Sequence, residues 1–386
     1  MRVKLKDAFN LQMGKTPSRA DLSLWGGNNK WISIADIGSA KKHISSTKEC
    51  ITDEGVSRSG IKVVPEGTVI MSFKLSIGKT AIVSEDMYTN EAIMAFIDNG
   101  TYCIDPNYLY HLCCGTDWTQ GGNKAVMGLT LNKATLSEME IELPTIEEQR
   151  EIASILDQLD AIIEKRHDEL NMIEQLVKSR FIELFGDYDL THPQESWVTI
   201  KEIGTVVGGA TPKTDHDEYW GGSYRWITPA ELDGDSGYIY DSVRKLTKAG
   251  VESCSLQEMP VGTVILSSRA PIGKVAIAGN TFYCNQGFKN IICKEGITPR
   301  YLYTVLLLNV EYLNSLGRGA TFKEISKGIV ESIRIPVPSM ELQQQFAAFV
   351  EQTDKSKYYS SLSFRYCQAA ANTYRQEWMT CRTSDF

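Results

Sequence analysis

The segment with the clearest catalytic potential is SIGKT, at residues 76–80, which ends like a phosphate-binding loop. Such a loop needs another glycine five positions before the glycine of the Gly-Lys pair, so that backbone amides surround a phosphate. Phe73 stands there instead, and the related segment later in the chain has Val275 where a serine or threonine is needed. We therefore interpret both segments as turns between strands, not as nucleotide sites.

Metal and redox chemistry also lack a suitable pattern. The five histidines never stand four residues apart, which argues against a zinc site. The sequence also contains no GxGxxG unit and no motif typical of an amino-methyltransferase or a nuclease. Nine cysteines without a CxxC pair favour reduced thiols and a cytoplasmic location. No run of about 18 apolar residues predicts a membrane span. We expect a non-catalytic chain without cofactor or metal. The histidines are His43, His111, His167, His192 and His216.

The strongest pattern in the chain is an internal repeat. A shift of 195 residues places Gly14 on Gly209 and the WGG segment at 25–27 on that at 220–222. The same shift aligns IGKTAI with IGKVAI, and near the end of each copy LPTIEEQ answers VPSMELQ. So many matches in the same order indicate duplication of a whole half-protein, because the period is too long for a solenoid unit.

Each copy combines a β-rich part with a long helix. Short β-branched runs punctuated by glycine, such as GTVIMSF and GTVILSS, predict strands joined by turns. We expect helices around residues 108–113 and 301–308, and closing strands at 139–143 and 333–337.

A heptad pattern follows the first globular part. Residues 146–185 contain no proline or glycine, and their apolar residues recur at spacings of three and four, which predicts a coiled coil. About 40 helical residues extend roughly 60 Å. Arg166 and Arg180 occupy positions of the same seam and weaken it locally. The expected interface residues are Ile152, Leu156, Leu159, Ile163, Leu170, Ile173 and Val177.

These elements predict an α+β fold with two pseudo-repeated β-rich globular domains joined by two long antiparallel coiled-coil helices. The expected segments are a first target-reading domain at 1–144, a spacer helix with its exit at 145–195, a second domain at 196–338 and a C-terminal spacer helix at 339–386. The last helix has an atypical tail rich in Ser, Tyr and Cys after Lys357. One hypothesis is that a frameshift or rearrangement replaced its native end. Two related reading heads suit two separated sites on DNA.

The chain resembles the specificity subunits of type I restriction-modification systems. The resemblance rests on GATP, YWGG, RWIT, GTVILSSRAPIGK and VPSMELQ in the second copy. The first copy has related strings in the same order, so the resemblance covers about residues 2–355. It implies two target-recognition domains, each reading half of a bipartite sequence in double-stranded DNA. It also implies that the helices dock DNA methyltransferase subunits, of which two are expected, and that restriction translocase subunits join the assembly.

Polar residues near the Thr-Pro turns and in the strands are the candidate DNA contacts. Lys, Arg and Asn read base edges or hold phosphates, whereas we interpret the tryptophans as anchors of the core and turns. Charges shared by both copies, such as Lys79 and Lys274, suggest phosphate positioning, and residues that differ suggest sequence reading. For any one of these residues, a solvated surface charge remains an alternative. The candidates are Ser18, Arg19, Asn28, Asn29, Lys30, Lys74, Lys79, Lys213, Thr214, Tyr224, Arg225, Arg269 and Lys274.

The net charge of −8 does not exclude DNA, because it is unevenly distributed. Residues 145–195 carry 5 basic and 13 acidic residues, while both globular parts are nearly neutral. We expect weak DNA binding by the chain alone, with partners supplying further positive charge. Two alternatives stay open: a coiled-coil scaffold with duplicated protein- or carbohydrate-binding globes, and a nucleotide-dependent enzyme that uses IGKT.

Overall fold

The computed structural model describes residues 1–74, 76–118, 124–125, 128–129, 131–232, 237–269, 271–319, 323–378 and 381–382. Two compact units divide the chain. Unit 1 comprises Met1–Lys165 with Phe364–Phe386, and unit 2 comprises Arg166–Ser363. Each unit therefore contains one globular part, called globe one or globe two, with segments of the long helices α6 (Ile146–Phe185) and α12 (Met340–Trp378). The fold is α+β, as predicted.

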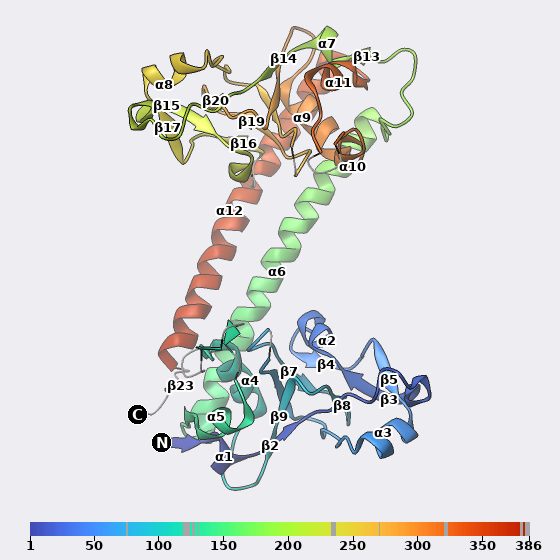
Figure 1. The fold of residues 1–386 in the computed structure, drawn as a ribbon, viewed down its shortest axis with the longest axis vertical. Helices are drawn as coiled ribbons and strands as arrows, with labels where there is room; N and C mark the ends of the chain where they lie inside the picture. Colours follow the sequence, from blue (N-terminus) through green and yellow to red (C-terminus); the bar gives the residue numbers. More distant parts are fainter. Residues whose placement is uncertain are drawn as a thin grey trace. The chain divides into compact units, whose positions relative to one another are not determined.

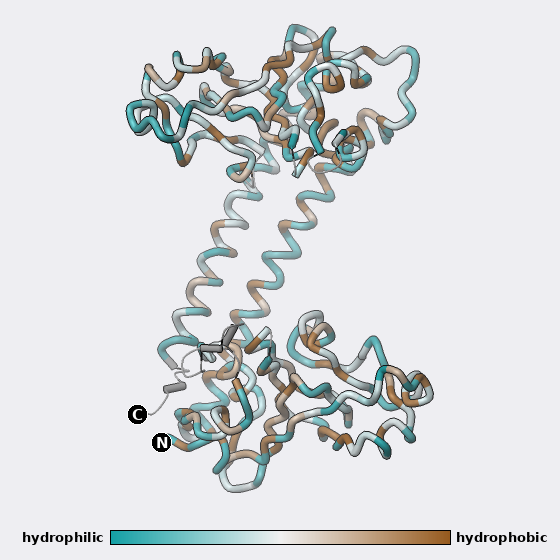
Figure 2. The backbone as a smooth tube through the Cα atoms, in the orientation of Figure 1, coloured by the Kyte–Doolittle hydropathy of each residue, from teal (hydrophilic) through white to brown (hydrophobic). Residues whose placement is uncertain are grey.

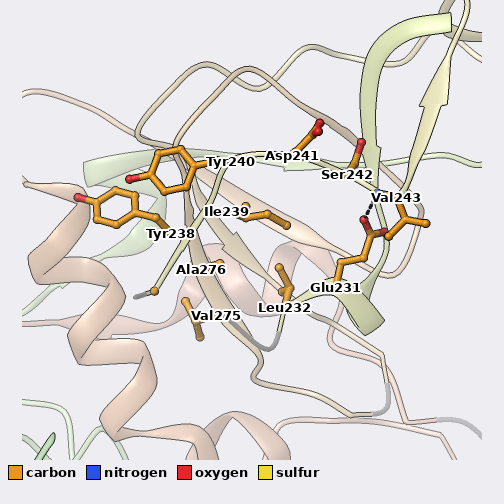
Figure 3. A pocket seen from close by; sticks show the side chains of 11 residues that line it. Glu231, Leu232, Tyr238, Ile239, Tyr240, Asp241, Ser242, Val243, Val275 and Ala276 are labelled. Carbon is orange, nitrogen blue, oxygen red and sulfur yellow. Dashed lines mark hydrogen bonds between the residues drawn. The ribbon is translucent and has the colours of Figure 1, made fainter. Parts of the chain in front are cut away.

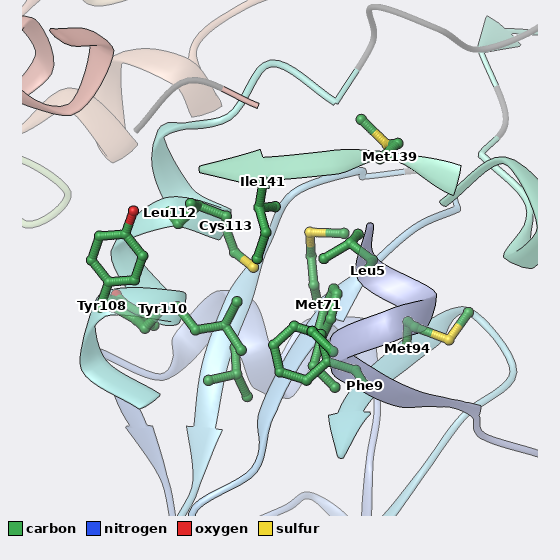
Figure 4. Close-up of a cluster of buried hydrophobic side chains, with 14 of the residues drawn as sticks. Leu5, Phe9, Met71, Met94, Tyr108, Tyr110, Leu112, Cys113, Met139 and Ile141 are labelled. Carbon is green, nitrogen blue, oxygen red and sulfur yellow. The ribbon is translucent and has the colours of Figure 1, made fainter. Parts of the chain in front are cut away.

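Globe one is built on a five-stranded sheet of order β2-β9-β6-β7-β4, in which only the β4–β7 pair is parallel. Val69 and Met71 of this sheet (Figure 1) belong to a core shared with α4 (Pro106–Gly115) and α6, and Figure 4 shows Met71 in this core. Ile70 belongs to a second core on the opposite face, because successive side chains of a strand alternate between faces. Both faces are covered, which explains the continuous apolar runs of β6 and β9. The strands are β2 (Phe9–Met13), β4 (His43–Ile44), β6 (Val69–Ser72), β7 (Thr80–Val83) and β9 (Ile93–Asp98).

A smaller sheet of order β5-β3-β8 completes globe one, and it carries the tryptophans. Trp31 in β3 lies opposite Glu49 of β5 on one side and Tyr88 of β8 on the other. Its strands are β3 (Trp25–Ile32), β5 (Glu49–Ile51) and β8 (Tyr88–Thr89).

Globe two repeats both sheets. Its five-stranded sheet has the order β14-β21-β18-β19-β16, and its smaller sheet the order β17-β15-β20. Trp226 lies opposite Arg244 and Tyr283, the same register as in globe one. The strands are β14 (Gly204–Gly208), β15 (Trp220–Ile227), β16 (Tyr238–Ile239), β17 (Arg244–Leu246), β18 (Val264–Leu266), β19 (Val275–Ala278), β20 (Tyr283–Cys284) and β21 (Lys289–Cys293).

Short helices and strands complete the two globes. The expected helices around 108–113 and 301–308 are α4 and α9, and the expected closing strands are β12 and β22. The helices are α1 (Leu5–Ala8), α2 (Ile34–Ser39), α3 (Asp53–Ser59), α4 (Pro106–Gly115), α5 (Lys133–Glu138), α7 (Ile200–Ile203), α8 (Lys248–Ser253), α9 (Pro299–Leu308), α10 (Val310–Ser315) and α11 (Lys327–Ser332). The remaining strands are β1 (Arg2–Lys4), β10 (Lys124–Ala125), β11 (Gly128–Leu129), β12 (Glu140–Glu142), β13 (Val198–Thr199), β22 (Arg334–Ile335) and β23 (Cys381–Arg382).

The IGK segments are turns between strands, as predicted. Gly78 joins β6 to β7 with φ 90°, and its amide donates to the Ser72 carbonyl at 2.9 Å. Gly273 has the same φ between β18 and β19, and its amide donates to the Ser267 carbonyl at 3.1 Å. Side chains rarely adopt this left-handed backbone, so glycine is needed for the turn rather than for a phosphate.

The parts of the long helices in unit 2 run antiparallel. Phe181 of α6 packs against Phe346 of α12 with ring centroids 5.4 Å apart, and Lys357 donates to Glu174 at 2.9 Å. Apolar positions recur along these otherwise polar helices (Figure 2). The predicted seam residues Leu170, Ile173 and Val177 are half-buried at this spacing, as are Arg166 and Arg180.

In unit 1 the first turns of α6 belong to the core of globe one. Ile152 and Leu156 are buried there, Leu159 packs against the same core, and Ile163 is half-buried. Ile152, Leu156 and Leu159 therefore contact the core of globe one.

The atypical tail is helical and contacts globe one within unit 1. Helix α12 continues to Trp378, Ala371 is fully buried, and Tyr374 packs against the core of globe one. Arg375 donates to both carboxylate oxygens of Asp160 at 2.6 Å. The departure from a heptad pattern thus does not end the helix early, because the globe provides packing that a heptad seam would otherwise supply.

A buried histidine lies near this tail contact. His111 of α4 is fully buried, with its Nε2 2.7 Å from Asp157 Oδ1 and its Nδ1 3.8 Å from Asp160 Oδ2. Burial lowers the pKa of His111 more than the neighbouring carboxylates raise it. Lys42 also donates to Asp157, at 2.5 Å. Helices α4, α6 and α12 and the loop that carries Lys42 therefore share one polar network in unit 1.

Candidate nucleic-acid interface

Two tryptophans anchor the Thr-Pro loop of each globe. Trp25 and Trp31 pack edge to face at 5.1 Å, and their indole N–H groups donate to the carbonyls of Ser18 at 3.1 Å and Lys15 at 3.0 Å. Trp220 and Trp226 repeat this geometry at 5.1 Å. The tryptophans therefore serve as anchors, in agreement with the interpretation of the sequence.

A side-chain hydrogen bond also holds each Thr-Pro loop, and the accepting residue differs between the two globes. Thr16 donates its hydroxyl to Glu91, and Thr211 donates to the equivalent Gln286. A Cβ on Gly14 would lie 2.0 Å from the carbonyl oxygen of Thr89, so only glycine permits this close approach. The loop backbone is thus fixed in the same way in both copies while its side chains vary.

Acidic neighbours hold three candidates of globe one, which are Arg19, Asn29 and Lys30. The guanidinium carbon of Arg19 lies 3.8 Å from the Trp25 ring centroid, and Arg19 forms a two-point ion pair with Glu49. The hydrogen bond from Arg19 lowers the pKa of Glu49. Lys30 pairs with Glu85, and Asn29 donates to Asp53 at 2.9 Å. Ser18 and Asn28 are exposed.

The candidates of globe two near its tryptophan-bearing sheet include an ion pair and an aromatic contact. Arg225 donates to Asp241 at 3.2 Å, and Tyr224 packs edge to face on Tyr283 at 6.0 Å. Lys213 and Thr214 are exposed on the loop that precedes β15.

The four candidates near the IGK turns lie in a different part of each globe. Lys74 lies over the Phe73 ring at 5.2 Å, and Lys79 is exposed. Arg269 donates to Glu324 at 3.0 Å, and Lys274 donates to the Pro229 carbonyl at 3.2 Å. These residues follow β6 and β18 of the five-stranded sheets, whereas the other candidates lie on the smaller sheets or the loops before them.

Arg244 is a candidate that we did not predict from the sequence. Its guanidinium carbon lies 3.5 Å from the Trp220 ring centroid, in the place that Arg19 occupies over Trp25. The shift of 195 residues pairs Arg244 with Glu49, so the repeat contained the signal. Arg244 was overlooked because it comes from β17, far in sequence from the tryptophan on which it lies.

A groove of 460 Å³ borders the segment before Arg244 (Figure 3). Its walls include Tyr238 and Tyr240, and at one end Glu231 accepts a hydrogen bond from the amide of Val243 at 2.8 Å. Within the described residues, no group of three or more His, Cys, Asp or Glu side chains is arranged to hold a metal ion.

A family model described as "Type I restriction modification DNA specificity domain" matches residues 1–175 and 195–358, one match for each copy. The chain belongs to this family. In the part of the chain that the structure describes, no helix is long and apolar enough to cross a membrane.

Curated relatives are named as specificity subunits of type I restriction enzymes. The chain is 43% identical over 185 residues to the MjaIX specificity subunit of Methanocaldococcus jannaschii, which covers 46% of this chain and 43% of that protein. It is 27% identical over 215 residues to the EcoR124I/EcoR124II specificity subunit of Escherichia coli, covering 53% and 52%. These alignments span about half the length of the curated relatives.

Solved structures share the fold along the whole chain. The S subunit of a type I restriction-modification system from M. genitalium has a TM-score of 0.59 at 15% identity, covering 99% of this chain and 96% of that one. A chain from a structure of type I R-M complex assembly and conformational transition has a TM-score of 0.57 at 17% identity, covering 98% and 97%. At these identities the likeness concerns the fold alone.

Proposed function

We propose that this chain is the DNA-sequence specificity subunit of a type I restriction-modification system. Each globe reads one half of a bipartite target in double-stranded DNA, and the segments 1–144 and 196–338 are the two target-recognition domains. The observation that carries the proposal is the duplicated family domain, in which the same loop and sheet geometry presents different side chains.

The proposed role is non-catalytic and cytoplasmic. The chain directs two DNA methyltransferase subunits and the restriction translocase subunits to the target, and those partners perform the chemistry. The long helices are proposed as spacer and docking surface. Residues 145–195 are strongly acidic, which suits contact with basic faces of protein partners better than contact with DNA.

Two groups can be distinguished among the proposed DNA contacts, which also include Asn29, Lys74, Lys79 and Lys274. Ser18, Asn28, Lys213, Thr214 and Tyr224 are exposed and could contact DNA as they stand. An ion-paired candidate must give up its carboxylate partner before it can contact DNA. This loss reduces the net gain in binding free energy. These candidates are Arg19, Lys30, Arg225 and Arg269.

Methylome sequencing of a host with and without the gene tests the proposal. We expect one bipartite methylated motif to disappear when the gene is deleted and to return with the gene supplied in trans. An unchanged methylome would contradict the proposal and favour a scaffold with protein- or carbohydrate-binding globes.

A further inference from the structure

Each smaller sheet has one edge strand, β5 or β17, that follows a tight turn. The same hydrogen bonds hold this turn in both globes. In globe one, Thr47 Oγ1 donates to the Glu49 carbonyl at 2.8 Å, and the Lys48 amide donates to Asp36 Oδ1 at 3.1 Å. In globe two, Ser242 Oγ donates to the Arg244 carbonyl at 2.7 Å, and the Val243 amide donates to Glu231 Oε2 at 2.8 Å.

The acidic residue in each turn is itself fixed by a helical N-terminus. Asp36 Oδ2 accepts from the Ser33 amide at 2.8 Å at the start of α2. Glu231 Oε1 accepts from the Thr228 amide at 2.9 Å, at the start of the short 3-10 helix Pro229–Glu231. One carboxylate oxygen thus caps a helix while the other holds the turn, so the backbone of both turns is preorganised.

This shared backbone presents different side chains. Globe one has Lys48 and Glu49 where globe two has Val243 and Arg244. Lys48 and Arg244 are exposed, and Val243 is 86% exposed although it is apolar. A fixed backbone with side chains that differ in size and charge is what two domains of one fold need in order to read different sequences.

Arg244 has the more favourable geometry for reading a base. Its guanidinium lies over Trp220, which restricts the orientation of the planar group before any ligand arrives. Among the described residues, no carboxylate forms an ion pair with Arg244, whereas Arg19 in the equivalent place is neutralised by Glu49. A preoriented guanidinium without such a partner retains its donors for O6 and N7 of guanine.

We propose that position 48 of globe one and positions 243–244 of globe two are base-reading positions, with Arg244 reading a guanine in the half-site of globe two. Val243 beside it is placed for apolar contact with a thymine methyl group. The inference rests on the proposed function, which supplies the DNA target.

The test uses the complex of this chain with its methyltransferase subunits. Binding competition is measured on duplexes in which each position of the bipartite target is varied in turn. We expect R244A and R244K to lose roughly 10- to 100-fold discrimination at the same single position of one half-site. K48A should affect only the other half-site. R19A serves as a matched control, because it also removes an arginine from a tryptophan and should leave the half-site of globe two unchanged.

Two results would overturn the inference alone. If R244K keeps the full discrimination of the natural protein, Arg244 acts by charge on a phosphate. If R244A weakens binding to all sequences equally, it reads no base. Thermal unfolding of each variant should match the natural protein, since the substituted side chains lie at the surface. Absence of any bipartite preference in the natural complex would instead overturn the proposed function itself.

Discussion

Arg19 and Glu49 form a two-point ion pair above Trp25, in which Arg19 Nη2 lies 2.9 Å from Glu49 Oε2. The pair comes from a loop and a strand 30 residues apart. It leaves the tryptophan-bearing sheet of globe one without the exposed positive charge that Arg244 gives to globe two. This difference leads to the first prediction.

Glu49→Gln should strengthen DNA binding by the assembled complex. The substitution keeps the size of the side chain but leaves the charge of Arg19 free to contact a phosphate. The slope of the logarithm of the binding constant against the logarithm of the salt concentration should therefore steepen by about one phosphate contact. Fluorescence anisotropy at several salt concentrations measures this. Glu66→Gln is the control, since it removes the same charge from an exposed turn of globe one. Equal slopes for the two variants would argue against a masked arginine.

Arg375→Ala should loosen the tail helix from globe one. Arg375 is largely buried and contacts both oxygens of Asp160, which is 38% exposed, so we expect a cost of about 1 kcal/mol. Hydrogen exchange should increase in residues 364–378. Lys355→Ala is the control, because it removes a charge from the same helix. The partner of Lys355 is Glu351, which lies one turn away on α12. Unchanged exchange in R375A relative to K355A would show that the ion pair does not hold the tail.

His111 should make unit 1 less stable as the pH falls from 7 to 5. Burial lowers the pKa of His111 in the folded state, so the unfolded chain takes up a proton near pH 6.5 that the folded chain does not. The stability is therefore present above that pH and is lost below it. The pKa of Asp157 is lowered as well, because hydrogen bonds from Lys42 and His111 outweigh burial, and its contribution is lost only at lower pH.

His111→Thr tests this assignment, because globe two has Thr304 at the equivalent position. The stability of both proteins is measured by urea unfolding at pH 7.5, 6.5 and 5.5, with hydrogen exchange in α4 as the readout. We expect the free energy of unfolding to fall less with decreasing pH for H111T than for the natural chain. The same pH dependence in both proteins would contradict a buried neutral histidine.

The sequence predicted the duplicated architecture because repeats are directly visible in an offset comparison. The turn at Gly78 was predictable too, since the phosphate-loop interpretation lacked a required glycine and the flanking runs were β-branched. These features depend on local pattern or on self-similarity, and neither requires knowledge of distant contacts.

The charge pairing of the candidate site was not predictable. Arg19 appeared as an available DNA contact, and its partner Glu49 became apparent only from the register that places Glu49 opposite Trp31. Arg244 was missed for the same reason. The tail was another such case, because Tyr374 packs against the core of globe one and Arg375 pairs with Asp160 instead of continuing a heptad seam.

Exchange of one globe tests the central claim most directly. Residues 1–144 are replaced by the corresponding domain of a relative with a different methylated motif, and the methylome of the host is sequenced. Our account predicts that one half of the bipartite motif changes to that of the donor while the other half stays the same. A change in both halves, or in neither, would contradict the assignment of one half-site to each globe.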